Sequence, residues 1–270
     1  MTSSFIPATG VLASLDLLQV TLDDSVAHVR LNRPAKRNAI SDTLIQQLHT
    51  CFINLPEHVK AAVVSGEGDH FCAGLDLSEL VERDIGSGVL HSRMWHAAFD
   101  AIQFGRVPVV AVLHGAVVGG GLELASTCHI RVAEASTYYG LPEGQRGIFV
   151  GGGGSVRIPR LMGVARMTDL MLTGRVYDAN EGLQVGLAQY LVPDGEGLAK
   201  GIALARRIAT NAPMSNYAVM HALPRIADQA QSEGLLTESL MAAVAESTPD
   251  AQSRLRAFLE GRAGKVVKAS

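Results

Sequence analysis

The chain has 270 residues, of which 47% are hydrophobic and 18% are charged, and its formal net charge is −3. This composition favours a folded chain with a large core rather than disorder, and the length suits one compact domain with an appendage. The small negative charge argues against a nucleic-acid backbone or an anionic membrane surface as a partner.

Cysteine usage and the amino terminus both favour a cytoplasmic protein. The three cysteines, Cys51, Cys72 and Cys128, are widely spaced and include no C-x-x-C pair. The first residues have no basic side chain ahead of their apolar positions, so they do not resemble a secretory signal. The most apolar segment, residues 107–125, contains proline, histidine, glutamate and glycines, which disfavours a membrane helix.

The first half of the chain shows strands and helices in alternation. Residues 17–22 and 26–31 alternate apolar and polar positions around a polar turn, which predicts a hairpin. Ser41 is a suitable N-cap for an amphipathic helix that runs to about Asn54. Apolar runs bounded by glycine predict two buried strands, residues 61–65 and 109–113.

The pattern changes along the second half. A helix is expected after Gly121 and a third buried strand at residues 129–133, so the core has α/β layers. The stretch at residues 86–88 is interpreted as a mobile surface loop. Beyond about Pro193 only helices are expected; their residues are 198–209, 214–227, 235–245 and 251–259. We therefore expect a core at residues 1–200 and a C-terminal helical subdomain at 201–270.

Two glycine-containing segments are candidates for ligand binding. Residues 70–77 follow a strand and place small residues before a helix start, where free backbone N–H groups can point at a ligand. Residues 119–121 are three successive glycines, and they leave the backbone bare at another helix start. Glu123 follows them after one leucine, in an apolar segment where burial of a carboxylate is costly without a purpose or a partner. Its alternative interpretation is a surface or paired glutamate.

A second carboxylate stands in a turn. Glu143 directly follows Pro142, so it does not belong to a regular helix interior, and by itself it is equally compatible with an ordinary loop residue. The sequence lacks the G-x-S-x-G motif of serine hydrolases. It also has no glycine-rich nucleotide-binding motif between a predicted strand and a helix. The histidines form no metal-binding motif, and His91 and His96 fit a pocket wall or the core. We expect no metal site.

Taken together, these segments resemble the crotonase superfamily, the enoyl-CoA hydratases and isomerases, from residue 17 to about residue 261. Residues 31–40 are similar to the family's L-N-R-P-x-x-x-N-A segment, and residues 71–76 to its F-x-A-G-x-D turn. Residues 119–123 are similar to its G-G-G-x-E helix start. Shorter similarities follow at residues 172–175, 186–188 and 257–262.

The resemblance implies a fold and an assembly. The expected architecture is an α/β, crotonase-like spiral of ββα units with a C-terminal helical trimerisation subdomain. Relatives are commonly homotrimers or homohexamers, and we expect one of these states here. The implied partner is an acyl-CoA thioester; coenzyme A is part of that substrate, and no permanently bound cofactor is expected.

The resemblance also assigns roles to residues. By matching motifs, Leu75 and Gly120 supply the backbone N–H groups of an oxyanion hole, and Glu123 and Glu143 form the acid/base pair. The positions expected to bind the rest of the substrate are Lys36, Arg37, Ala39, Ala73, Asp76, Leu77, Gly119 and Pro142. Lys36 and Arg37 are candidates for phosphate contacts, or they are solvated loop charges.

The implied reaction is hydration of a 2-enoyl-CoA to the 3-hydroxyacyl-CoA, as in fatty acid beta-oxidation. The alternatives are an enoyl-CoA isomerase, a non-catalytic acyl-CoA-binding homologue, and an aromatic enoyl-CoA hydratase-lyase, which Met94, Trp95 and Phe99 weakly favour.

One segment departs from the family pattern. After Glu143 the family has an apolar stretch and then P-G-x-G-G, whereas this chain has Val150 in place of the proline. Gln145 and Arg146 add polarity, and a cation near Glu143 would lower the pKa of its carboxyl unless Arg146 points away.

Overall fold

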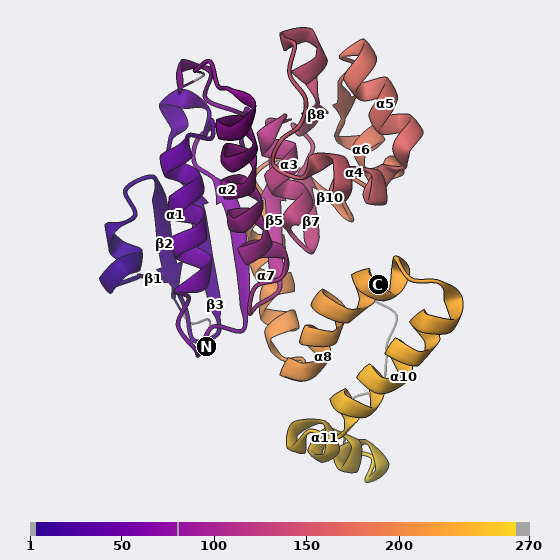
Figure 1. Cartoon of the computed structure of the whole chain (residues 1–270). Helices are drawn as coiled ribbons and strands as arrows, with labels where there is room; N and C mark the ends of the chain where they lie inside the picture. The colour runs from indigo at the N-terminus through magenta and orange to yellow at the C-terminus, as the bar shows by residue number, and fades with distance from the viewer. Residues whose placement is uncertain (1–3, 80, 263–270) are drawn as a thin grey trace. The chain divides into compact units, whose positions relative to one another are not determined.

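The computed structural model describes residues 4–79 and 81–262, which form two compact units (Figure 1). The first unit ends at Ala209 and the second begins at Thr210. Helix α7 (Gly197–Ala209) therefore belongs to the first unit, where it packs against strands β4 (Ala61–Gly66) and β5 (Val109–Leu113).

Within the described residues, the first unit has a seven-stranded sheet and a small three-stranded sheet. The seven-stranded order is β1-β2-β3-β4-β5-β7-β10, and the small sheet has the order β6-β8-β9. The first three strands pair antiparallel, and from β3 onward the pairs are parallel. The remaining strands are β1 (Ile6–Pro7), β2 (Leu18–Leu22), β3 (Val26–Leu31), β6 (Ala116–Val118), β7 (Ile130–Glu134), β8 (Tyr138–Gly140), β9 (Tyr177–Asp178) and β10 (Tyr190–Val192).

The helices follow in chain order. Those of the first unit are α1 (Asp42–Ile53), α2 (Ile85–Gln103), α3 (Gly120–Thr127), α4 (Gly154–Met162), α5 (Val164–Thr173), α6 (Ala179–Val185) and α7, with short turns η1 (Gly10–Ser14), η2 (Pro34–Lys36), η3 (Leu77–Glu79) and η4 (Pro142–Arg146). Those of the second unit are α8 (Pro213–Tyr217), η5 (Ala218–Ala222), α9 (Leu223–Ala227), α10 (Gln231–Glu246) and α11 (Pro249–Leu259). In the part of the chain that the structure describes, no helix combines the length and apolarity needed to cross a membrane.

The parallel part of the large sheet is covered on both faces, which explains its apolar sequence. In β4, Ala62 and Val64 face the core beneath α1 and α2, whereas Ala61 and Val63 face the core beneath α7. Successive side chains of a strand point to opposite faces, so a strand buried on both faces needs apolar residues throughout. Figure 1 shows α1 and α2 together on one side of the sheet.

The two sheets create repeated ββα units. After β5 the chain enters β6 and then α3; after β7 it enters β8 and then η4. After β4, Cys72 makes an isolated parallel bridge to Val117, so this segment takes the corresponding place beside the small sheet. The predicted hairpin, α1 with its Ser41 cap and the α/β layers are confirmed. The turns after these strands come together and supply the site.

The expected mobile loop at residues 86–88 is wrong. These residues form the first turn of α2, and Asp84 is its N-cap, with Oδ1 accepting from Ser87 N at 2.8 Å. A side-chain cap satisfies an N–H group that the helix start leaves unpaired, and it offsets the low helix propensity of the two glycines. Because α2 begins here, its first turns reach the site.

Helices make up the described part of the second unit, whereas the helix expected at residues 198–209 is α7 of the first unit. α10 packs against α9 and η5, and α11 follows it. Several large apolar side chains of α10 and α11 are exposed; they are Leu235, Leu236, Leu240, Val244, Leu255, Phe258 and Leu259. Apolar exposure of this extent is typical of an interface with another protein chain.

Candidate active site

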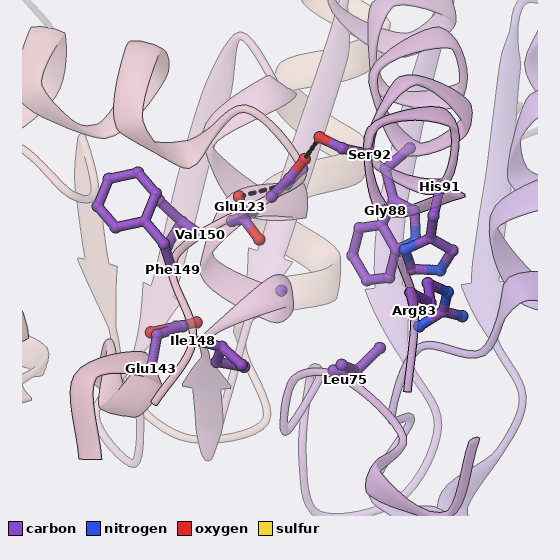
Figure 2. Close-up of a pocket in the computed structure, with 14 residues that line it drawn as sticks. Leu75, Arg83, Gly88, His91, Ser92, Glu123, Glu143, Ile148, Phe149 and Val150 are labelled. Atoms are coloured by element: carbon purple, nitrogen blue, oxygen red, sulfur yellow. Dashed lines mark hydrogen bonds between the residues drawn. The ribbon is translucent and has the colours of Figure 1, made fainter. Parts of the chain in front are cut away.

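A cavity of about 320 Å³ opens in the first unit and contains both glutamates singled out from the sequence (Figure 2). It lies among α2, the start of α3, η4 and the segment that leads into α4. Its lining residues are Leu75, Arg83, Gly88, His91, Ser92, Trp95, Gly120, Glu123, Glu143, Ile148, Phe149, Val150, Gly151 and Gly152.

The glycines before Glu123 are required by close packing. Gly119 has φ 54°, a conformation that favours glycine, and a Cβ there would lie 2.8 Å from Glu143 Oε1. A Cβ at Gly121 would lie 2.3 Å from the Cys72 carbonyl oxygen. Because every residue of α3 is buried, this turn carries Glu123 into the interior rather than to the surface.

Two backbone N–H groups at the cavity are candidates for binding a ligand. Leu75 and Gly120 both line the cavity, and neither amide has an acceptor among the described residues. The bonds Ile40 N to Gly74 O at 2.7 Å and Asp76 N to Ile40 O at 2.9 Å fix the backbone on either side of Leu75. The two segments are adjacent, because an ideal Cβ on Gly74 would lie 3.7 Å from Gly120 N. Paired N–H groups of this kind suit a developing oxyanion.

Glu123 is almost completely buried, with 4% of its surface exposed. Its Oε1 accepts hydrogen bonds from Gly152 N and Gly154 N, each at 2.8 Å. Burial raises the pKa of the Glu123 carboxyl to about 7; the neighbouring Glu143 also raises it, whereas the two glycine N–H groups and Arg157 lower it. With one oxygen held, the other oxygen is left for a ligand.

Glu143 reaches the same cavity from η4 and is 7% exposed. Its Oε2 is buried and has no hydrogen-bond partner in the described part of the chain. Burial raises the pKa of this carboxyl, and the Arg146 charge opposes the rise without overcoming it. Arg146 itself is exposed, so the cation expected to weaken the acid is outweighed by burial.

The segment that departs from the family pattern forms a wall of the cavity. Val150 is buried, with 6% exposed, and Ser92 Oγ donates to Gly151 O at 2.6 Å. Arg157 of α4 donates to Gly152 O at 3.0 Å, and its side chain also meets Asp100 and Gln103 of α2 at 2.7 and 2.6 Å. These contacts fix the loop whose N–H groups hold Glu123.

Comparison with known proteins identifies the family. The model of the enoyl-CoA hydratase/isomerase family matches residues 21–266, nearly the whole chain. The chain belongs to this family. The crotonase-like fold that the sequence implied is thereby confirmed, together with the mixed sheet and C-terminal helices.

Individual relatives cover most of the chain. A candidate enoyl-CoA hydratase of known crystal structure from Rhodopseudomonas palustris CGA009 is 56% identical, covers 94% of this chain and 98% of its own, and superimposes with a TM-score of 0.90. Enoyl-CoA hydratase EchA19 of Mycobacterium tuberculosis is 30% identical over 87% of this chain and 90% of its own length. A Bacillus anthracis enoyl-CoA hydratase structure is 30% identical over 92% of this chain and 97% of its own, with a TM-score of 0.85.

The structure brings together the four residues expected at the reacting centre: Leu75, Gly120, Glu123 and Glu143 all line the cavity. The eight positions expected to hold the rest of the substrate lie outside its lining; they are Lys36, Arg37, Ala39, Ala73, Asp76, Leu77, Gly119 and Pro142. Lys36, Arg37 and Leu77 are exposed, Asp76 and Gly119 are buried, and Ala73 N donates to Arg37 O at 3.0 Å.

The Asp76 carboxylate is occupied by protein groups. It accepts from Arg33 Nη2 at 2.9 Å and from Ser78 Oγ at 2.6 Å, and only 5% of the residue is exposed. The hydrogen bonds from Ser78 and Arg33 hold the pKa of Asp76 at about 2 against the effect of burial. Its position beside Leu75 makes it a brace for the turn that presents the Leu75 N–H group.

The sequence did not single out the charged wall at α2. Arg83, His91 and Ser92 line the cavity, and only the interpretation of His91 as a pocket-wall residue pointed there. Trp95 also lines it, and Phe99 packs edge-on against Trp95 with ring centroids 5.7 Å apart.

Within the described residues, no three histidine, cysteine or acidic side chains are grouped as metal ligands.

Proposed function

We propose that this chain hydrates a 2-enoyl-CoA thioester to the 3-hydroxyacyl-CoA. The observation that carries the proposal is the pairing of Glu123 and Glu143, two buried carboxyls of raised pKa, in one cavity with the unpaired N–H groups of Leu75 and Gly120. The hydratase names of the relatives support it.

The residues divide the reaction between them. The thioester oxygen accepts hydrogen bonds from the Leu75 and Gly120 N–H groups, and negative charge develops on that oxygen as water attacks. Each such donor is typically worth roughly 2.7–4 kcal/mol of transition-state stabilisation. In the proposed complex, coenzyme A extends toward Lys36 and Arg37, and Ala39, Ala73, Asp76, Leu77, Gly119 and Pro142 are the further positions proposed to bind or support the substrate.

Glu123 and Glu143 handle the protons. Glu123, ionised and fixed through Oε1, accepts a proton from water through its other oxygen while the water oxygen bonds to the β-carbon. Glu143, protonated, donates its proton to the α-carbon, so the elements of one water molecule are added. Because the two carboxyls interact, their apparent pKa values belong to the pair.

The first test is turnover of the purified protein with straight, branched and aromatic 2-enoyl-CoA thioesters in ¹⁸O-labelled water. A hydratase incorporates one labelled oxygen into the product. An isomerase shifts the double bond without incorporating oxygen, a hydratase-lyase releases a shorter product, and a binding protein leaves every thioester unchanged. Any of these three outcomes would replace the proposed reaction.

Glutamine substitutions test the two carboxyls. We expect Glu123→Gln and Glu143→Gln each to lower kcat by roughly 10²- to 10⁴-fold, because each removes a positioned proton carrier and keeps nearly the same shape. The dissociation constant of a saturated acyl-CoA should change little. Glu57→Gln, at an exposed glutamate outside the cavity, is the matched control. Unchanged turnover in both cavity variants would contradict the proposed roles.

A further inference from the structure

One wall of the cavity carries positive charge that the proposed reaction does not use. Figure 2 shows Arg83 and His91 together on the α2 side of the cavity, whereas Glu143 comes from the opposite side. Arg83 directly precedes Asp84, the N-cap of α2, and its side chain is only 23% exposed. A guanidinium mostly shielded from solvent needs hydrogen-bond acceptors for its five N–H donors.

Protein groups in the described ranges, residues 4–79 and 81–262, supply few of these acceptors. Within the described residues, Arg83 donates no hydrogen bond of ordinary length; its one ion pair places Nη2 3.7 Å from Asp42 Oδ2. Asp42 is itself 41% exposed, and its other oxygen is taken by His91 Nε2 at 2.6 Å. Asp42 thus orients Arg83 and His91 toward the cavity and leaves most of the guanidinium donors open.

The remainder of the cavity favours an acyl chain. Leu75, Trp95, Ile148, Phe149 and Val150 provide apolar side chains to the cavity lining, and Ile148, Phe149 and Val150 lie on the side of Glu143 (Figure 2). The expected phosphate contacts, Lys36 and Arg37, are not part of this lining. If the thioester oxygen binds at Leu75 and Gly120, the coenzyme A part of the substrate extends toward Lys36 and Arg37. The acyl part then fills this cavity.

We propose that the substrate is a 2-enoyl-CoA whose acyl chain ends in a carboxylate. Arg83 binds this carboxylate, and Asp42 and His91 hold the Arg83 side chain in position. The inference rests on the proposed function, because that function sets the orientation of the substrate. The start of α2 adds favourable potential for an anion at this wall, partly offset by the exposed Asp84 cap. An arginine fork fits a terminal carboxylate through two parallel hydrogen bonds.

The test compares acyl groups that differ only at the far end. Saturated six-carbon acyl-CoA ligands ending in a carboxylate or a methyl group are titrated against the protein, with coenzyme A alone as a reference. The matching 2-enoyl-CoA substrates, from four to eight carbons, are then assayed for turnover. We expect the carboxylate-ended compounds to bind roughly 10- to 100-fold more tightly, the range typical of one hydrogen-bonded charge pair.

Variants of Arg83 distinguish loss of carboxylate recognition from a general loss of acyl-CoA binding. Arg83→Gln should bring the ratio of the two dissociation constants close to one, and Arg83→Lys should retain part of the preference through its charge. Arg93→Gln, at an exposed arginine on the same helix, should leave the ratio unchanged. A wild-type ratio near one, or an equal loss for both ligands in Arg83→Gln, would overturn the assignment.

The two proposals fail in different ways. If no 2-enoyl-CoA gains water, the hydratase proposal fails, whereas the binding ratio of the saturated ligands still tests Arg83. If methyl-ended substrates are hydrated as efficiently as carboxylate-ended ones, the hydratase proposal stands and the specificity proposal fails.

Discussion

Glu123 is a carboxyl whose ionisation the folded protein disfavours. Burial and the neighbouring Glu143 raise its pKa from 4.5 to about 7, despite two hydrogen bonds to Oε1. Between these two pH values the unfolded chain has lost the proton and the folded chain keeps it, so unfolding releases protons. The stability contributed by this group is therefore present below pH 4.5 and is lost as pH rises through about 7.

The loss of stability with rising pH gives a prediction for Glu123→Gln. The amide oxygen still accepts from Gly152 and Gly154, but the side chain stays neutral at every pH. Between pH 5 and pH 8.5, the free energy of unfolding of the variant should rise by roughly 2–3 kcal/mol relative to that of the wild type. Urea denaturation at both pH values measures this difference. A difference that does not change with pH would show that Glu123 ionises normally in the folded chain.

At the scale of elements, the site depends on how α2 and α4 hold the loop between them. Arg157 of α4 joins Asp100 and Gln103 of α2 to the Gly152 carbonyl oxygen. The neighbouring N–H groups of this loop hold Glu123. The position of the Glu123 carboxyl is thus set by contacts between elements and not by α3 alone.

Replacing Arg157 with glutamine should disturb both the loop and the charge of Glu123. We expect kcat to fall by about tenfold and the free energy of unfolding by about 1–3 kcal/mol, because hydrogen bonds of a charged group are lost. Since the Arg157 charge lowers the pKa of Glu123, its removal should also move the rise of kcat to higher pH. A pH–rate profile measures the shift, with Arg160→Gln, exposed on the same helix, as the control. An unshifted profile would limit Arg157 to a structural role.

At the scale of the whole molecule, the second unit exposes an apolar surface that suggests assembly. Leu235, Leu236 and Leu240 of α10 are 57–62% exposed, and α11 adds Phe258 and Leu259 at 65% and 75%. At about 25 cal/mol per Å² of apolar surface removed from water, covering these side chains favours association. We propose that the chain forms a homotrimer or a homohexamer through this surface.

A charge on α10 tests the proposed assembly. Leu236→Glu combined with Leu240→Glu should shift sedimentation from the trimer or hexamer toward the monomer, because the interface would have to bury two carboxylates. Ala13→Glu combined with Ser253→Glu adds the same number of carboxylates at exposed positions outside α10, and is the charge-matched comparison. Wild-type protein that sediments as a monomer at micromolar concentration would rule this surface out as a self-association interface.

The sequence alone determined the features set by local pattern and by motif. Alternation predicted the β2–β3 hairpin, a serine cap and apolar spacing predicted α1, and motif order implied the family that the comparisons confirm. The same motifs selected Glu123 and Glu143. The spacing of hydrophobic residues and the residues that form turns are local patterns of a few positions, so they can be recognised in a single sequence.

Only the tertiary structure decided the environment of the selected residues. It placed residues 86–88 in α2, grouped Arg83 with His91 on the cavity wall, and set Gly152 and Gly154 against Glu123. It also showed that burial outweighs Arg146 at Glu143. Burial, pairing and pKa depend on groups far apart in the sequence that packing brings together, and local pattern carries no information about those distances.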